Sequence, residues 1–263
     1  MNNVTYLLGA GASFQAIPVQ NQLSSEMMKF LIRLKMIFLK NKSNLAHINN
    51  SWIPILNLAV NHASIDTYAK KLFITRNYND LFQLKLILSA YFIYEQSSEP
   101  DDPANIKDFA QYSKSPIDPR YDFFMAALLK VQIESPILPE NLRIVSWNYD
   151  SQIEMAFHPY SKISYDDDEA LRKQLNLFPR LNYEYSCDYP DDTMHNQIVK
   201  LNGTAANFVV DNARSNHIKS HRRLFLAEAT DQISILLETG IHYNSTTAYH
   251  ATGANINFAW ELK

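Results

Sequence analysis

A glycine-rich turn near the amino terminus is the part of this sequence best suited to hold a ligand. The apolar run Val4–Leu8 leads directly into Gly9-Ala10-Gly11-Ala12-Ser13, and two of the five glycines of the chain fall in this turn. Glycine adopts backbone angles closed to other residues and, without a Cβ, lets the main chain approach a ligand closely. A helix that begins just after such a turn directs free N–H groups and its positive dipole end at a phosphate. The pattern predicts the phosphate end of a nucleotide site.

Two further polar turns follow short apolar runs later in the chain. Leu142–Trp147 is followed by Asn148-Tyr149-Asp150, and Ile198–Leu201 is followed by Asn202-Gly203-Thr204. The first of these turns also suits a helix N-cap, a role that asparagine and aspartate favour. Parallel α/β sheets bind ligands at the carboxyl ends of their strands. If the runs are neighbouring strands, the three turns converge on one pocket.

Two common nucleotide-binding patterns do not fit the glycine turn. The dinucleotide fingerprint G-x-G-x-x-G has its third glycine where this chain has Phe14, and its acidic partner follows a strand, whereas residues 23–38 are predicted to be helical. A P-loop needs Gly-Lys-Ser/Thr after four intervening residues, and neither Gly9 nor Gly11 is followed by that sequence. A dehydrogenase and a P-loop ATPase are both disfavoured.

Strands that alternate with helices along the chain predict the fold class. The class is α/β, with a Rossmann-like parallel sheet and helices on both of its faces. Apolar residues at helical spacing predict a long helix over residues 23–38. We expect a single domain, 1–263, with its core from 1–39 and 140–263 and a large all-helical insertion, roughly 40–135, after the first strand and helix.

The remaining segments add three helices and a strand to this outline. Residues 160–196 are acidic and tyrosine-rich and show no clear period. The other expected elements are helices over Leu81–Tyr94, Tyr121–Val131 and Leu224–Leu237 and a last strand over Ile256–Trp260.

Composition and charge limit the class of protein. With 263 residues, 46% of them hydrophobic, the chain can bury a sizeable core. Its formal net charge of −3 gives no basic field that would attract an anionic membrane, and no direct nucleic-acid binding is expected. The longest apolar stretch, Leu86–Tyr94, is too short to span a membrane. The single cysteine, Cys187, and the lack of a secretory signal lead us to expect a cytoplasmic protein.

Taken together and in order, the three turns resemble the NAD-binding motifs of the sirtuin (SIR2-like) superfamily. Those motifs are G-A-G-x-S with a nearby G-I-P, then x-N-x-D, then a strand that ends in H-G. The residues that carry the resemblance are Gly9–Ser13 with Ile17-Pro18, Trp147–Asp150 and Lys200–Gly203. Ile65–Leu72 and Asn257–Glu261 are similar to features of the bacterial SIR2-like branch found in anti-phage defence proteins.

The resemblance implies a role for each motif, with NAD as the substrate. The residues expected to bind NAD are Gly9, Ala10, Gly11, Ala12 and Ser13 around the pyrophosphate, with Pro18, Trp147, Gly203 and Thr204. Asn148 would lie near the nicotinamide ribose and its reacting C1′ atom, and Asp150 beside the carboxamide. Cleavage of the N-glycosidic bond develops oxocarbenium character at C1′, so the site must orient a nucleophile. Asn148 can position a water or a ribose hydroxyl, and Asp150 can accept from an amide NH₂.

Two departures from the family pattern bear on activity. Deacylase sirtuins carry a zinc module of four cysteines, so with one cysteine we expect no zinc and no other metal site. The resemblance then implies the activity of the defence branch, NAD hydrolysis to nicotinamide and ADP-ribose. Asn202 occupies the position of the family histidine, a general base, and an amide lacks useful basicity near neutral pH. Natural loss of activity, deliberate inactivation or a base from elsewhere, such as His195, would each account for Asn202.

Other classes of function stay open. Asn202 favours a domain that binds NAD or ADP-ribose without turnover and works as a sensor or scaffold through partner proteins. A helical interaction protein with a purely structural glycine turn is the third class. The resemblance also implies a homo-oligomer or a regulatory protein partner. The family pattern continues beyond Trp260 with a further strand and a glycine-serine turn, which implies a truncated or short divergent domain.

Overall fold

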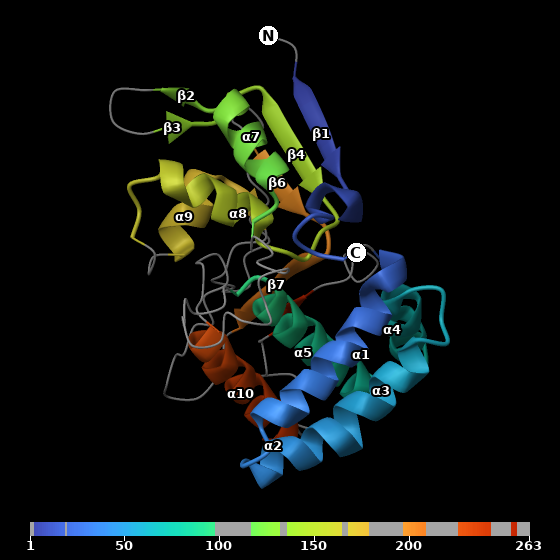
Figure 1. Cartoon of the computed structure of the whole chain (residues 1–263). Coiled ribbons are helices and arrows are strands. Elements are labelled where there is room, and N and C mark those ends of the chain that lie inside the picture. Colours follow the sequence, from blue (N-terminus) through green and yellow to red (C-terminus); the bar gives the residue numbers. More distant parts are fainter. Residues whose placement is uncertain are drawn as a thin grey trace.

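The computed structural model is a mixed α/β protein in which a parallel sheet lies beside a group of longer helices (Figure 1). In the view of Figure 1 the sheet and its helices are in the upper half and the longer helices in the lower half. The structure describes residues 3–18, 20–97, 117–131, 136–164, 168–178, 197–208, 226–242 and 254–256. Among the helices of these segments, none has both the length and the apolar character needed to cross a membrane.

Four parallel strands form the main sheet in the order β1-β4-β6-β5. Their bounds are Val4–Leu8 for β1, Leu142–Ser146 for β4, Gln197–Lys200 for β6 and Leu177–Phe178 for β5. Tyr6 of β1 pairs with Ile144 of β4, which pairs in turn with Ile198 of β6. The three strands predicted to precede the polar turns are therefore confirmed, and they are neighbours with their carboxyl ends at one edge.

One face of the sheet is buried beneath three helices. These are α7 (Pro119–Leu128), α8 (Gln152–Phe157) and α9 (Asp168–Gln174). Because successive strand residues point to opposite faces, β4 buries Leu142, Ile144 and Ser146 on this side. Leu7 of β1 points to the opposite face and is 62% exposed. In the described segments helices cover one face, and a helical cover on the other stays a prediction.

The group of helices in the lower half of Figure 1, some long and some short, forms a second hydrophobic core around α5. They are α1 (Gln20–Ile37), α2 (Lys42–His47), the π-helical turn Ile48–Trp52, α3 (Ile53–Ala59), α4 (Ile65–Ile74), α5 (Tyr78–Glu95) and α10 (Leu226–His242). α5 confirms the helix predicted over Leu81–Tyr94, and it is buried along most of its length, as expected for a helix that is apolar all round. α10 joins from far along the chain, since Gln83 donates to the carbonyl of Gly240 at 2.8 Å. The helical core thus draws on segments on both sides of the range 40–135.

Polar side chains fix where the helices around the site begin. The Ser64 hydroxyl accepts from the Thr67 amide at 3.1 Å and caps α4. Asp118 accepts from the Arg120 amide at 3.0 Å and caps α7, whose first residue is Pro119. Such caps satisfy amides that have no partner inside the helix.

The structure differs from the sequence prediction at the end of α7 and within residues 160–196. α7 ends at Leu128 because Leu129 is extended, and Lys130–Val131, predicted as helix, pairs antiparallel with Pro136–Ile137 as β2 and β3. Within 160–196, α9 has seven residues and β5 has two, lengths too short to show a period. The missed β5 completes the sheet at its edge.

The first and last predicted elements also differ. α1 begins at Gln20, and the glycine turn itself forms a single 3₁₀ turn, Ala10–Ser13, with Gly9 at its start. The predicted final strand overlaps β8, Ala254–Ile256, which pairs antiparallel with β7, Gly203–Phe208, outside the parallel sheet. The rest of that prediction, residues 257–260, lies outside the described residues.

Candidate functional site

The three polar turns meet at one cavity, as their places after parallel strands predict. Main-chain pairing continues just past the strands, since Trp147 N–H donates to Leu8 at 3.0 Å and Leu201 N–H donates to Ser146 at 2.8 Å. The cavity holds about 350 Å³, within the usual range for a small-molecule site. Its lining comprises Gly9, Ala10, Ser13, Ile17, Pro18, Leu23, Ile65, Asp66, Phe92, Trp147, Asn148, Tyr149, Asp150 and Asn202.

The glycine turn forms one wall without needing glycine for its own conformation. Gly9 has φ −112°, an angle open to any residue, and a Cβ on Gly9 or Gly11 would meet no atom within 4 Å. The absent side chain at Gly9 therefore leaves open space in the cavity wall. Gly11 is not among the residues that line the cavity, and neither is Ala12, which packs against the sheet core.

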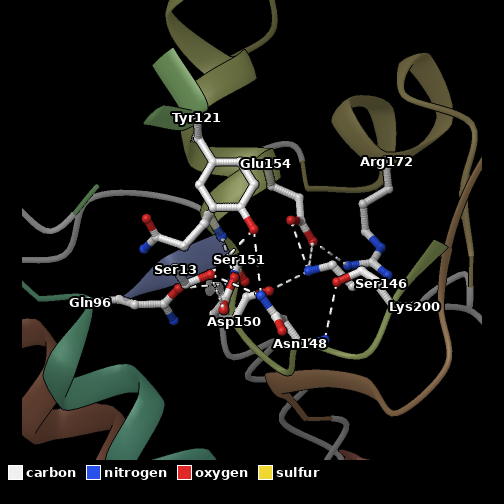
Figure 2. Close-up of polar contacts among 11 residues, drawn as sticks. Ser13, Gln96, Tyr121, Ser146, Asn148, Asp150, Ser151, Glu154, Arg172 and Lys200 are labelled. Atoms are coloured by element: carbon white, nitrogen blue, oxygen red, sulfur yellow. Dashed lines mark hydrogen bonds and ion pairs between the residues drawn. The ribbon is translucent and has the colours of Figure 1, made fainter. Parts of the chain in front are cut away.

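A hydrogen-bond chain joins residues of the first two turns that line the cavity (Figure 2). The Ser13 hydroxyl donates to Asp150 Oδ2 at 2.7 Å, and Asn148 Nδ2 donates to Ser13 Oγ at 3.0 Å. Tyr121 of α7 brings its hydroxyl to 3.3 Å from the same Ser13 oxygen. Since an ionised carboxylate only accepts, Ser13 must donate to Asp150, and its oxygen then accepts from Asn148. This chain fixes the orientation of the Asn148 amide.

Asp150 is held in a buried setting by groups on three sides. Its side chain accepts from the Gln152 amide at 3.1 Å as well as from Ser13, and the residue is 4% exposed. Burial raises the pKa of the Asp150 carboxyl, while the charge of Lys200 and the bond from Ser13 oppose that rise. The Lys200 ammonium also donates to the main-chain carbonyl of Asp150.

A buried ion cluster lies beside Asp150 (Figure 2). Lys200 Nζ donates to the two carboxylate oxygens of Glu154 at 2.7 and 2.9 Å, and Arg172 lies 3.4 Å from Glu154 Oε1. Burial alone would raise the pKa of Glu154, but the charges of Lys200 and Arg172 hold that pKa below its usual value. Two cations face two carboxylates, so the cluster is neutral when Asp150 is ionised.

Asn202 lies at the cavity, where its amide Nδ2 donates to the carbonyl of Trp147 at 2.9 Å. The residue is 6% exposed, and Gly203 after it has φ 69°, the left-handed region that favours glycine. This turn directs the chain out of the parallel sheet into β7. Thr204 lies in β7. His195, the alternative base, lies outside the described residues.

Two side chains of the site have no signal in the spacing of the sequence. Tyr121 comes from α7, in the segment predicted as a plain helix. Asp66 comes from the first turn of α4 and accepts from the Tyr149 hydroxyl at 2.5 Å. Asp66 belongs to Ile65–Leu72, which the resemblance to the defence branch singled out without giving it a role.

Comparisons of the chain with models of protein families, with curated proteins and with solved structures found no match in any of the three. In the described segments no group of three or more histidine, cysteine, aspartate or glutamate side chains could hold a metal ion. Cys187 lies outside those segments.

Proposed function

We propose that this chain binds NAD⁺ in the cavity and hydrolyses its N-glycosidic bond, releasing nicotinamide and ADP-ribose. The observation that carries the proposal is the convergence of the glycine turn, Asn148 and Asp150 on one cavity, linked through the Ser13 hydroxyl. A turn with open space in front of Gly9 can accommodate the pyrophosphate. The reacting half of the nucleotide then extends toward the polar side chains of Asn148 and Asp150 in the cavity lining.

The hydrogen-bond chain determines what Asn148 can offer to a substrate. Because Nδ2 of Asn148 is bound to Ser13, its amide oxygen is the atom suited to accept from a water or a ribose hydroxyl near C1′. Asp150 has acceptor capacity for the carboxamide NH₂ in addition to its bonds from Ser13 and the Gln152 amide. Fixed groups of this kind lower the barrier because they need no reorganisation during the reaction.

The order of the motifs supports membership of the SIR2-like superfamily, with a Rossmann-like core and a helical insertion. On that basis the chain resembles the bacterial branch in which NAD depletion serves anti-phage defence. A homo-oligomer or a regulatory protein partner in the cytoplasm belongs to the same proposal. The proposed membership is supported by three motifs that occur in the family's order and lie along one edge of a parallel sheet: Gly9–Ser13, Trp147–Asp150 and Lys200–Gly203.

Nicotinamide release from NAD⁺ by the purified chain tests the proposal directly. Asn148→Ala is expected to reduce the rate by at least about 100-fold, the usual cost of removing one preorganised polar group. Asn57→Ala on the exposed surface of α3 is the matched control and should leave the rate unchanged. Equal rates for the Asn148 variant and the control would show that Asn148 has no part in the reaction.

Binding without turnover is the second candidate, and Asn202 is the observation that favours it. The amide at this position cannot take a proton from water as an imidazole would. Calorimetry with NAD⁺ and with ADP-ribose, run beside the nicotinamide assay, separates the two candidates. Saturable binding with no nicotinamide release would establish a sensor or scaffold.

A further inference from the structure

Hydrolysis in this cavity needs a group that can accept a proton from water, and Asn202 does not supply one. None of the described residues that line the cavity is a histidine, and two of them carry carboxylates, Asp66 and Asp150. Asp150 is 4% exposed, and both of its carboxylate oxygens already accept hydrogen bonds inside the protein. Asp66 is therefore the carboxylate best placed to meet a water molecule.

The position of Asp66 is fixed from both sides of the cavity. It sits in the first turn of α4, which Ser64 caps, so the positive end of a ten-residue helix favours its ionised form. Its Oδ1 accepts from the Tyr149 hydroxyl at 2.5 Å. Tyr149 is itself held against Phe92, with ring centroids 5.8 Å apart. Tyr149 stands between Asn148 and Asp150 in the chain, so the turn that carries the proposed substrate contacts also orients Asp66.

The environment of Asp66 suits a base that works near neutral pH. Burial raises the pKa of the Asp66 carboxyl, and the hydrogen bond from Tyr149 opposes the rise. A raised pKa makes the carboxylate a stronger base, which favours general-base catalysis.

We propose that Asp66 is the general base of this site and takes the place of the absent histidine. The inference rests on the proposed NAD⁺ hydrolysis. The bond between C1′ and the nicotinamide nitrogen breaks, and its electron pair stays on that nitrogen, so nicotinamide leaves neutral. A water oxygen forms the new bond to C1′, and Asp66 takes the water proton and releases it to solvent. Tyr149 is a positioning residue that aims the carboxylate.

The test measures nicotinamide release and NAD⁺ affinity for wild type and Asp66→Asn. Loss of a general base typically costs about 10²- to 10⁴-fold in rate, so we expect at least a 100-fold fall with a Kd for NAD⁺ within about threefold of wild type. Asp80→Asn, in the first turn of α5 and outside the cavity lining, is the matched control and should keep the full rate.

Two further variants separate a base from a structural residue. Asp66→Ala leaves room for a small carboxylate, so added formate should restore nicotinamide release in this variant. The same formate should leave the rate of wild type unchanged. Tyr149→Phe removes the bond that opposes the rise in pKa, so the acid limb of its pH–rate profile should move to higher pH. The other titratable groups of the cavity near Asp66 are Tyr149 and Asp150. The pH–rate profile of Asp150→Asn shows how much Asp150 contributes to the acid limb.

The outcomes distinguish this inference from the proposed function. An active wild type with an equally active Asp66→Asn variant would overturn the role of Asp66 and leave NAD⁺ hydrolysis standing. Loss of NAD⁺ binding in Asp66→Asn without formate rescue of Asp66→Ala would show a structural residue and overturn the role as base. A wild type that binds NAD⁺ and releases no nicotinamide would overturn the hydrolysis and, with it, any base at Asp66.

Discussion

Lys200→Met should destabilise the protein strongly, because it leaves a buried carboxylate pair short of one cation. The side chains of Lys200 and Glu154 are 1% and 0% exposed, and Arg172 approaches Glu154 only to 3.4 Å. With Lys200 removed, Glu154 and Asp150 carry two negative charges against the single charge of Arg172. The Asp150 carbonyl also loses its ammonium donor.

The magnitude follows from the cost of an uncompensated buried charge. Removing one partner of a buried ion pair typically costs about 3–5 kcal/mol. For a chain of this size each kcal/mol lowers the melting temperature by about 2–4 °C, so the expected fall is roughly 6–20 °C. Urea unfolding at pH 7, followed by tryptophan fluorescence, measures the change in the free energy of unfolding directly.

A double-mutant cycle tests the electrostatic reasoning behind that magnitude. Glu154→Gln in the Lys200→Met background leaves Arg172 and Asp150 as one cation and one anion, so the cluster is neutral again. The double variant should therefore be more stable than the sum of the two single losses implies, by about 1 kcal/mol or more. Additive losses, or a loss below about 1 kcal/mol for Lys200→Met alone, would refute charge balance as the basis of the cluster's stability.

Three other predictions concern the cavity and its surroundings. Gly9→Ala should keep the free energy of unfolding within about 0.5 kcal/mol, because its methyl group meets no protein atom, and should weaken NAD⁺ binding in calorimetry about tenfold or more. Gly240→Ala should do the reverse, losing about 1–3 kcal/mol in urea unfolding with unchanged NAD⁺ affinity, because its Cβ would lie 2.7 Å from Gln83 Oε1 and His47 Nε2. Burial raises the pKa of Asp150 above its unfolded-state value, so stability is lost as pH rises through the folded-state pKa. Asp150→Asn, which cannot ionise, does not share this loss, so the difference in stability between the variant and wild type should shift toward the variant as the pH of the unfolding assay rises above about 4.

The strands and the meeting of the turns could be predicted because both depend on local pattern. β1 and β4 are apolar runs of β-forming residues, and neighbouring parallel strands bring the turns at their carboxyl ends to one edge of the sheet. β5 was missed because two residues cannot display a period. Its place in the sheet is set by pairing with β6, a tertiary contact.

The supporting side chains of the site were missed for a different reason. Tyr121 reaches Ser13 across 108 positions of sequence, and Tyr149 reaches Asp66 across 83. No spacing rule covers contacts of that range, because they depend on how helices pack on the strand ends. Lysine is among the residue types that are least often fully buried, and the burial of Lys200 becomes reasonable only with Glu154 and Arg172 beside it.

The turn 148–150 has one more consequence, for the way the protein unfolds. Tyr149 packs in the helical core, whereas Asn148 and Asp150 are bonded to Ser13 and Tyr121 on the side of the sheet core. The cavity lining includes Phe92 and Tyr149 of the helical core. It also includes Ser13, whose hydroxyl lies 3.3 Å from that of Tyr121 in the sheet core, so a ligand that touches both parts of the lining binds only when both cores are formed. Its binding free energy therefore acts on their association and grows with the logarithm of ligand concentration. Ligand should therefore raise the free energy needed to separate the two cores, so that the nucleotide links the stability of one core to that of the other.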